Sequence, residues 1–208
     1  MIFVSQLILG RRDLKELKVT DDYSVHRVIY NFFVDQRDSE QKKMSESSGF
    51  LYVDLGGNAL GRRFLMLSNR IPKEMELNDS RIETKVLKDE FLLANAYRFK
   101  VVVNPTRRDA QTRKLVAVKG RENIAEWFAQ RAINTWGFCT DESLAVDKVE
   151  VKQFKGKDDH KIVITQAHIS GILTVTDRDR FIKAVSQGIG RSHAFGCGLL
   201  QIVPINQI

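Results

Sequence analysis

The sequence predicts an α+β protein made of two tandem units, each with an antiparallel sheet. The chain has 208 residues, which suits two domains of about 100 residues each. Its composition shifts near residues 89–95. On both sides of this shift, short alternating apolar segments typical of strands are interspersed with segments of helical period.

The first half opens with a strand at 2–9 that is rich in Ile, Val and Leu. Thr20 and Asp21 offer N-caps for a helix in VTDDYSVHRVIYNFFVD, where acidic residues occupy the favourable first turn. The remaining expected elements are a polar loop at 37–49, a hairpin of Phe50–Leu55 and Phe64–Ser68, and an exposed edge strand from Arg81.

The second half opens with a buried strand in YRFKVVVNP, followed by a helix in RENIAEWFAQRAINTWGF that Gly137 closes. Two strands, a helix capped by Asp177 and a last strand complete it: Ala145–Phe154, Lys161–Val175, DRDRFIKAVSQ and Leu199–Pro204. This β–α–β–β–α–β order is ferredoxin-like, and the first half repeats it with its second helix short or missing. We therefore expect two tandem ferredoxin-like (RRM-like) domains, residues 1–90 and 91–208.

The net charge of +7 is confined to the second half. Residues 1–90 carry 15 basic and 15 acidic side chains, whereas residues 91–208 carry 18 and 11. This excess favours a polyanionic partner, because each phosphate that is neutralised releases a counterion. A basic surface whose only role is to keep the protein in solution would give the same numbers of basic and acidic side chains.

Cysteine usage and hydropathy indicate a cytoplasmic, soluble protein. Cys139 and Cys197 have neither metal-binding nor disulfide-framework spacing, which suits a reducing compartment. No stretch approaches the roughly 18 to 20 apolar residues that span a membrane.

The segment GIGRSHAFGCGLLQIVPI, residues 188–205, is unusually rich in glycine. One glycine can cap the preceding helix, but the others indicate a backbone whose N–H groups converge on a concavity. A phosphate group is the ligand that such a turn is expected to bind. The residues that we expect around it are Gly188, Gly190, Arg191, Ser192, His193, Gly196 and Gly198.

The helix after Asp21 carries the best candidate for proton transfer. At about 100° per residue its core stripe contains Val25, Val28, Ile29 and Phe32, and Tyr23, His26 and Tyr30 fall together beside that stripe with Arg27 next to them. Tyr23 and His26 are one turn apart, and histidine titrates near neutral pH. A boundary histidine of an amphipathic helix has the same spacing.

The other histidines are weaker candidates. His160 lies in a charged turn, His168 in a strand, and His193 in the glycine-rich loop near the expected phosphate. No histidine pair or carboxylate cluster has metal-ligand spacing, so we expect no metal and no cofactor.

The glycine segment G-I-G-R-S-H-A-F-G-C-G-L-L resembles the terminal motif of the repeat-associated CRISPR protein superfamily, and is most similar to that of the CasE family, the CRISPR RNA endoribonucleases of type I-E systems. Y-S-V-H-R on the first helix, N-P-T before a basic segment and a chain of about 200 residues in two ferredoxin-like halves extend the resemblance to the whole chain. His193 departs from the pattern, since that position is expected to vary.

The resemblance implies a substrate and a reaction. Such proteins bind the hairpin of each CRISPR repeat and cut the precursor RNA at the 3′ base of the stem without a metal. The RNA's own 2′-hydroxyl attacks the neighbouring phosphate, leaving a 2′,3′-cyclic phosphate and a 5′-hydroxyl. The product is kept, and the protein serves as a subunit of the Cascade complex.

The resemblance also places the catalytic residues. His26 corresponds to the general acid or base, and Tyr23 to a residue that orients or protonates. A nearby cation is expected to stabilise the phosphorane, and Arg27 is expected to contact the RNA.

Two basic segments are expected to grip RNA phosphates along a deep A-form major groove. The residues are Arg107, Arg108, Arg113 and Lys114 in TRRDAQTRK, and Lys152, Lys155, Lys157 and Lys161 in VKQFKGKDDHK. A charged turn that is merely solvated is the alternative for any single lysine. The chain lacks the aromatic RNP1 pattern of single-strand binders, which favours a structured duplex as ligand.

Two other functions stay open at this point. A non-catalytic guide-RNA-binding subunit of the same superfamily needs the basic surface and the glycine loop but not the Tyr23–His26 pair. A metabolic enzyme could hold a small phosphorylated ligand in the glycine loop, although the charge imbalance counts against it.

Overall fold

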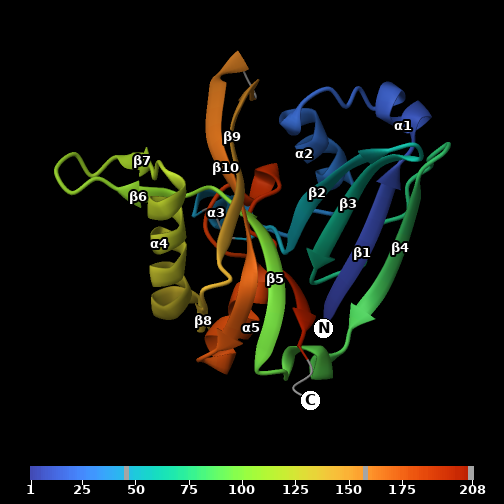
Figure 1. Ribbon diagram of the computed structural model, residues 1–208. Coiled ribbons are helices and arrows are strands. Elements are labelled where there is room, and N and C mark those ends of the chain that lie inside the picture. The colour runs from blue at the N-terminus through green and yellow to red at the C-terminus, as the bar shows by residue number, and fades with distance from the viewer. Residues whose placement is uncertain (45–46, 157–158, 206–208) are drawn as a thin grey trace. The chain divides into compact units, whose positions relative to one another are not determined.

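The computed structural model describes residues 1–44, 47–156 and 159–205 (Figure 1). The chain divides into two compact units. The first contains residues 1–87 together with 194–196, and the second contains residues 88–193 and the chain from Cys197 onward. The division at residues 90 and 91 into a catalytic and an RNA-binding domain stays a prediction.

The first unit is a four-stranded antiparallel sheet with helices attached. The strand order β2-β3-β1-β4 places β1 in the centre, where Phe3 pairs with Ser68 of β3 and with Val86 of β4. Its elements are β1 (Ile2–Leu9), α1 (Arg11–Glu16), α2 (Asp22–Asn31), α3 (Ser39–Lys43), β2 (Phe50–Asn58), β3 (Gly61–Ser68) and β4 (Arg81–Leu87).

Helix α2 covers this sheet and supplies much of the core (Figure 1). The Asp21 side chain accepts a hydrogen bond from the Ser24 amide, and the Ser24 hydroxyl accepts one from the Asp21 amide, which is a capping box. Of the two expected N-caps, Asp21 is therefore confirmed, whereas Thr20 lies before the cap. The predicted core stripe is also confirmed, since these residues are at most 3% exposed: Val25, Val28, Ile29 and Phe32.

The structure adds a helix to the predicted polar loop of the first unit, and it shows which of two predicted alternatives holds for the second helix. The polar loop at 37–49 contains α3, because Asp38 accepts from the amides of Glu40 and Gln41 while the Gln41 side chain accepts from the Asp38 amide. That reciprocal cap is a helix-start signal. The second helix of the ferredoxin-like order is missing, since residues 69–80 form no helix.

A buried carboxylate holds this irregular segment against α1. Asp13 is 2% exposed and accepts hydrogen bonds from the amides of Asn78 and Asp79 at 3.0 and 3.1 Å and from the Ser80 hydroxyl at 2.5 Å. Asp79 in turn accepts from the amides of Arg12 and Asp13 at the start of the helix. The loop and the helix thus satisfy each other's polar groups.

The second unit is built on a sheet of order β11-β5-β10-β8, with β9 pairing β10. All of these pairings are antiparallel. The elements are β5 (Ala96–Val103), β6 (Thr106–Arg108), β7 (Leu115–Ala117), α4 (Arg121–Arg131), β8 (Phe138–Thr140), β9 (Ala145–Lys155), β10 (Lys161–Val175), α5 (Arg178–Gln187) and β11 (Gln201–Pro204).

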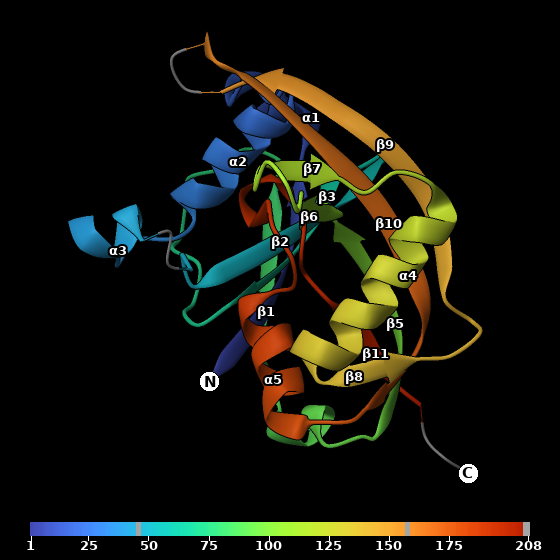
Figure 2. The same ribbon diagram turned by 90° about the vertical axis from the view of Figure 1, so that its left-hand side faces the viewer.

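The local signals of the second half are confirmed. Helix α4 continues into a π-helical turn, Ala132–Trp136, which Gly137 ends in the left-handed region, and Asp177 caps α5 through the Arg180 amide. Figure 2 shows α4 and α5 lying along the sheet that contains β10. Fully buried aromatic residues fill the space between them: Tyr97, Phe99, Phe128, Phe138 and Phe181.

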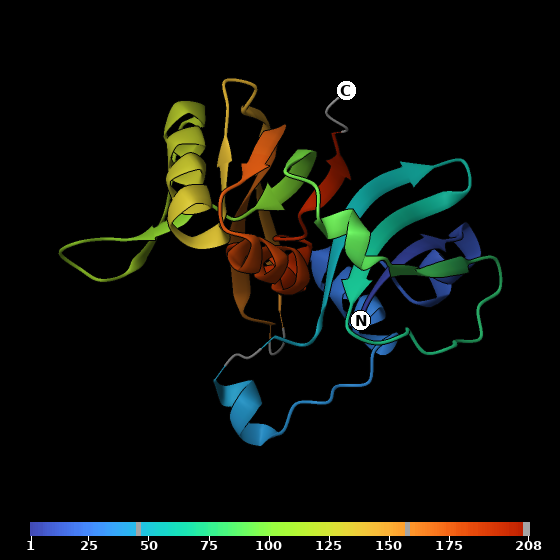
Figure 3. The same cartoon turned by 90° about the horizontal axis from the view of Figure 1, so that it is seen from below.

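The small hairpin β6–β7 extends away from α4 (Figures 1 and 3). It carries part of the basic segment that the sequence singles out. No helix in the described part of the chain has both the length and the apolar character needed to cross a membrane.

We predict that Asp13→Asn lowers the free energy of unfolding of the first unit by about 2–4 kcal/mol, because hydrogen bonds to a buried charge are lost. Burial alone would raise the pKa of Asp13, but hydrogen bonds from Ser80, Asn78 and Asp79 outweigh it and hold this pKa well below its usual range. The stabilisation is therefore present above the ordinary pKa of 3.8 and fades as pH falls below it.

Urea unfolding at pH 7 and pH 3 measures this effect. Glu83→Gln, on the exposed strand β4, is the matched control and should change stability by less than about 0.5 kcal/mol. Equal effects of the two substitutions at pH 7 would contradict the role of Asp13.

Candidate functional site

The His26 side chain sits in an aromatic cluster of the first unit. Its ring centroid lies 4.1 Å from that of Tyr30, 5.7 Å from that of Phe195 and 6.1 Å from that of Tyr23. Tyr23, His26 and Tyr30 share one face of α2, as their spacing in the sequence predicts. Phe195 comes from the glycine-rich segment and covers the imidazole.

The backbone of Ala194 anchors that segment in the first unit. The Tyr52 hydroxyl on β2 donates to the Ala194 carbonyl at 2.8 Å, and the His26 ring also hydrogen-bonds the backbone of Ala194. The Nδ1 atom of His26 is buried and has no hydrogen-bond partner among the residues that the structure describes.

Burial sets the protonation state of His26. Desolvation lowers the pKa of the imidazole below its ordinary value, and the hydrogen bond to Ala194 opposes this shift without cancelling it. His26 is consequently neutral at neutral pH. A neutral imidazole beside a phenol is suited to accept a proton.

The side chains around His26 differ in whether they form hydrogen bonds or ion pairs. The Tyr30 hydroxyl is hydrogen-bonded to Arg37. The Tyr23 hydroxyl has no hydrogen-bond partner within the described ranges, and Arg27 is exposed without an ion-pair partner there. Tyr23 and Arg27 are therefore available to a bound molecule.

The glycine-rich segment needs left-handed backbone. Gly196 has φ +76°, and a Cβ there would lie 3.4 Å from the Tyr52 ring. Gly198 has φ +91°, and a Cβ would lie 2.5 Å from the His193 ring. Gly188 is confirmed as the C-cap of α5, and around Gly190 the space is open.

His193 serves the turn itself. Its Nε2 lies 3.3 Å from the Ile189 carbonyl oxygen, and burial lowers the pKa of the ring. Its side chain is therefore turned toward the loop backbone of the second unit.

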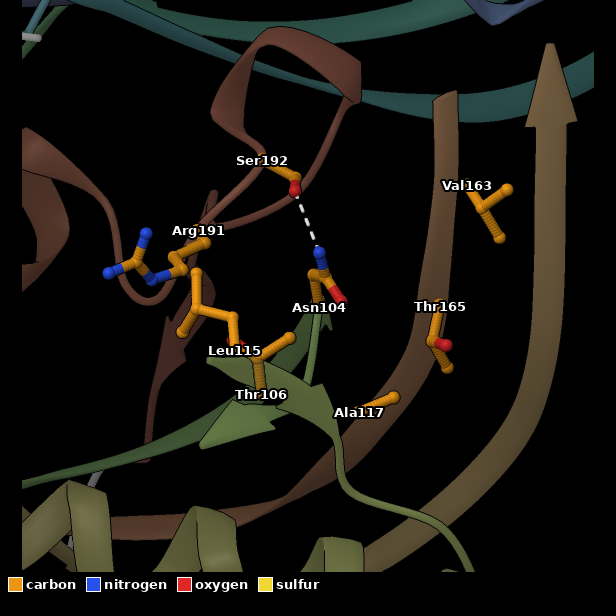
Figure 4. A pocket seen from close by; sticks show the side chains of 8 residues that line it. All are labelled: Asn104, Thr106, Leu115, Ala117, Val163, Thr165, Arg191 and Ser192. Carbon is orange, nitrogen blue, oxygen red and sulfur yellow. Dashed lines mark hydrogen bonds between the residues drawn. The ribbon is translucent and has the colours of Figure 1, made fainter. Parts of the chain in front are cut away.

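A cavity of about 420 Å³ lies in the second unit beside the glycine-rich segment (Figure 4). Asn104 at its base donates from Nδ2 to the Ser192 hydroxyl at 2.8 Å. The Oδ1 atom of Asn104 is buried and unpartnered within the described part of the chain. The lining residues are Asn104, Thr106, Leu115, Ala117, Val163, Thr165, Arg191 and Ser192.

The first basic segment forms the β6–β7 hairpin and its loop. Asp109 organises this loop by accepting from the Thr112 amide and hydroxyl, at 2.7 and 2.8 Å. Arg108 donates to the Arg113 carbonyl at 3.1 Å. The four cations predicted here are all exposed: Arg107, Arg108, Arg113 and Lys114.

The second basic segment follows the β9–β10 hairpin. Lys152 is half-buried with its Nζ 3.9 Å from Glu150, Lys155 lies 3.3 Å from Asp159, and Lys161 is exposed. Lys157 lies outside the described residues. These cations are on the second unit, as are the predicted residues Gly188 to His193, whereas His26, Tyr23 and Arg27 are on the first.

The remaining histidines occupy the elements that the sequence indicates. His160 is exposed beside the β9–β10 turn, and His168 on β10 lies 3.4 Å from Glu150. Among the described residues, no group of three His, Cys, Asp or Glu side chains could hold a metal ion.

Sequence reasoning missed the roles of Ala194, Phe195 and Asn104. The N-P-T motif contains Asn104, but nothing local to it indicates a cavity. Ala194 and Phe195 lie between the glycines, and their contact with α2 depends on residues more than 140 positions away.

The fold and the glycine-rich turn define a class: tandem ferredoxin-like proteins with a glycine-rich turn before the last strand. A family model described as CRISPR associated protein matches residues 2–204. The chain therefore belongs to this CRISPR-associated protein family, and the resemblance to CasE is confirmed.

Three relatives illustrate the similarity. The CRISPR-associated endoribonuclease Cse3 of Thermus thermophilus is 32% identical over 117 residues, which are 51% of this chain and 55% of that protein. The match thus spans about half the length of that relative. The CRISPR system Cascade subunit CasE of Escherichia coli is 22% identical over 98% of this chain and 100% of that protein.

The third is a solved structure of CRISPR endoribonuclease Cse3 bound to a 19-nucleotide RNA. It has a TM-score of 0.78 and 19% identity, covering 98% of this chain and 100% of that chain. This likeness confirms the tandem ferredoxin-like fold.

We predict that Phe195→Ala raises the pKa of His26 toward its ordinary value of 6.5, because water reaches the imidazole once the ring is removed. An NMR titration of the histidine ring protons measures this, with His26→Gln identifying the resonance. In the unsubstituted protein the midpoint should lie below 6.5.

Phe195→Leu is the control, since it keeps an apolar side chain over the imidazole and should leave the midpoint low. An unchanged midpoint in Phe195→Ala would show that this ring does not desolvate His26.

Proposed function

We propose that this protein is a metal-independent endoribonuclease that binds CRISPR repeat hairpins and cleaves precursor CRISPR RNA at the 3′ base of the stem. Family membership and the names of its relatives support this proposal. The observation that carries it is the neutral, half-buried His26 beside the exposed Arg27 and a Tyr23 hydroxyl that has no hydrogen-bond partner in the described ranges.

The proposed chemistry uses the RNA's own nucleophile. His26 takes the proton of a 2′-hydroxyl, and the 2′-oxygen forms a bond to the adjacent phosphorus. The bond from phosphorus to the 5′-oxygen breaks, and Tyr23 gives that oxygen a proton. A 2′,3′-cyclic phosphate and a 5′-hydroxyl result.

The two proton transfers require different groups, and the first unit offers both. A buried imidazole with a lowered pKa is already unprotonated at neutral pH, so it fits the base. Arg27 next to it offsets the charge of the phosphorane, which is the usual task of a fixed cation in phosphoryl transfer.

Binding is assigned to the basic segments and the glycine-rich turn. The exposed cations of the β6–β7 hairpin lie on an extended loop, a shape that follows a groove of phosphates. The residues proposed for RNA contact stay those of the sequence analysis, with Lys157 included as a sequence-based member. Retention of the product and assembly into Cascade belong to the same proposal, supported by the Cascade relative.

We predict that His26→Ala slows cleavage of a labelled repeat hairpin by about 10²–10⁴-fold and leaves its affinity within about twofold. Wild-type cleavage should persist in EDTA and disappear when the scissile nucleotide lacks its 2′-hydroxyl. Tyr23→Phe should also slow cleavage, because it removes the proton donor. Single-turnover assays on denaturing gels measure the rates.

Tyr30→Phe is the matched control for Tyr23→Phe, since its hydroxyl is occupied by Arg37. It should retain most of the activity. Tight binding with no cleavage by wild-type protein would instead favour a non-catalytic guide-RNA-binding subunit.

We also predict that replacing Arg107 and Arg108 with Ala reduces the salt dependence of hairpin binding. Each lost phosphate contact should lower the slope of log affinity against log salt by about 1. Affinity measured by fluorescence anisotropy between about 50 and about 300 mM KCl, a roughly sixfold range that brackets physiological salt, gives this slope.

The control replaces Arg11 and Arg12 with Ala. Both residues are exposed on α1, and their replacement removes the same formal charge. Equal slopes for the two double variants would mean that net charge alone, and not the hairpin, determines RNA binding.

A further inference from the structure

We propose that the cavity beside Asn104 binds one unpaired nucleotide of the RNA and reads its base through the Asn104 side chain. This subsite rests on the proposed function but uses none of the residues proposed for cleavage. It lies wholly within the second unit, between β10, the β6–β7 hairpin and the glycine-rich segment (Figure 4).

Asn104 supplies the polar end of the cavity. The residue is 8% exposed, and its Nδ2 is fixed by the hydrogen bond to Ser192. Its Oδ1 lies buried on the side away from Ser192 and accepts no hydrogen bond within the described residues (Figure 4). Buried polar atoms without partners are rare in native proteins, so an acceptor of this kind calls for a donor from a ligand.

The geometry holds this amide rigidly. Asn104 follows β5 directly and precedes Pro105, and its partner Ser192 has φ +65°. The acceptor is thus positioned before any ligand arrives. A preorganised hydrogen-bonding group discriminates between ligands that offer a donor and ligands that do not.

The walls of the cavity fit the faces of a nucleobase. Leu115 and Val163 are large aliphatic residues that remain 46% and 55% exposed, and Ala117 continues the apolar surface between them. Thr106 and Thr165 add hydroxyl groups to the lining. An apolar slot with one convergent acceptor suits a flat ring that carries N–H donors on its edge.

Positive charge surrounds the opening of the cavity. Arg191 lines it, is exposed and makes no ion pair with any residue in the described ranges. In the register of the hairpin, Arg108 pairs with Leu115 and lies two residues after Thr106, so it shares the cavity-facing side of the strands. Two cations flanking an apolar slot indicate a nucleotide with phosphates on both sides of its base.

The base that enters must be unpaired. In an A-form duplex the Watson–Crick edges are engaged with each other and the deep major groove hides the bases from side chains. Only an extruded or single-stranded base can bring its N–H donors to a buried acceptor. The cavity therefore reads a nucleotide that flanks the hairpin stem.

Abasic substitution tests the subsite. Full-length His26→Ala protein, which keeps the RNA intact, is titrated with repeat hairpins in which each flanking nucleotide is replaced in turn by an abasic residue. We expect one position to weaken binding about tenfold, the usual discrimination of one base contact. In the background of Asn104→Ala that position should no longer matter, while the affinity for native RNA drops by the same factor.

Two further variants keep the test decisive. Asn134→Ala removes an exposed asparagine of the same unit and should preserve the abasic effect. Val163→Trp fills the cavity from an exposed strand position, so it should reproduce the loss even where Asn104→Ala disturbs folding. An abasic effect that survives in both cavity variants, or that occurs at no position, overturns the subsite.

A separate readout distinguishes this proposal from the proposed function. The Asn104 side-chain amide is followed by NMR during titration with the hairpin RNA and with adenosine, cytidine, guanosine and uridine 5′-monophosphates. A shift of this signal with mononucleotides but no hairpin binding would refute the proposed function and retain the nucleotide subsite. Hairpin binding and cleavage without any shift at Asn104 would support the proposed function and refute the nucleotide subsite.

Discussion

The hydrogen bond from the Tyr52 hydroxyl to the Ala194 carbonyl is the contact on which the arrangement around His26 depends. It fixes a three-residue segment from late in the chain against the sheet of the first unit. That position brings Phe195 over the imidazole and the Ala194 backbone to its edge. Burial lowers the pKa of His26 and so keeps its imidazole unprotonated at neutral pH.

The glycines make this contact compatible with the chain's path. Segment 194–196 belongs to the first unit while its neighbours in the sequence belong to the second, and Gly190, Gly196 and Gly198 around it have positive φ. Glycine adopts this left-handed conformation at the smallest cost because it lacks a Cβ. At Gly198 a side chain would also collide with His193, which the turn holds through its own carbonyl groups.

The two units contribute different chemistry to the proposed function. The first buries a titratable group among aromatic rings, which controls its protonation. The second has an exposed cationic hairpin and a cavity beside an acceptor that has no partner among the described residues, which suits phosphate binding and base reading. Burial lowers the pKa of an imidazole, whereas phosphate binding needs accessible charge, so the two tasks favour different surfaces.

The sequence by itself determined the elements that local chemistry specifies. Asp21 and Asp177 cap helices, Gly137 and Gly188 end them, and the alternation in β10 predicts a strand, because each signal acts within about four residues. The shared face of Tyr23 and His26 follows equally from helical geometry. Even α3 carried a readable signal in the reciprocal pair of Asp38 and Gln41.

Only the tertiary structure decided what lies against those faces. Tyr52 and Ala194 are separated by 142 positions, and Asn104 and Ser192 by 88, so no local pattern predicts either pair. The direction of the pKa shift of His26 and the existence of a cavity at Asn104 both depend on such contacts. Burial is a property of distant segments packing together, and for that reason it emerged from the fold and not from the order of residues.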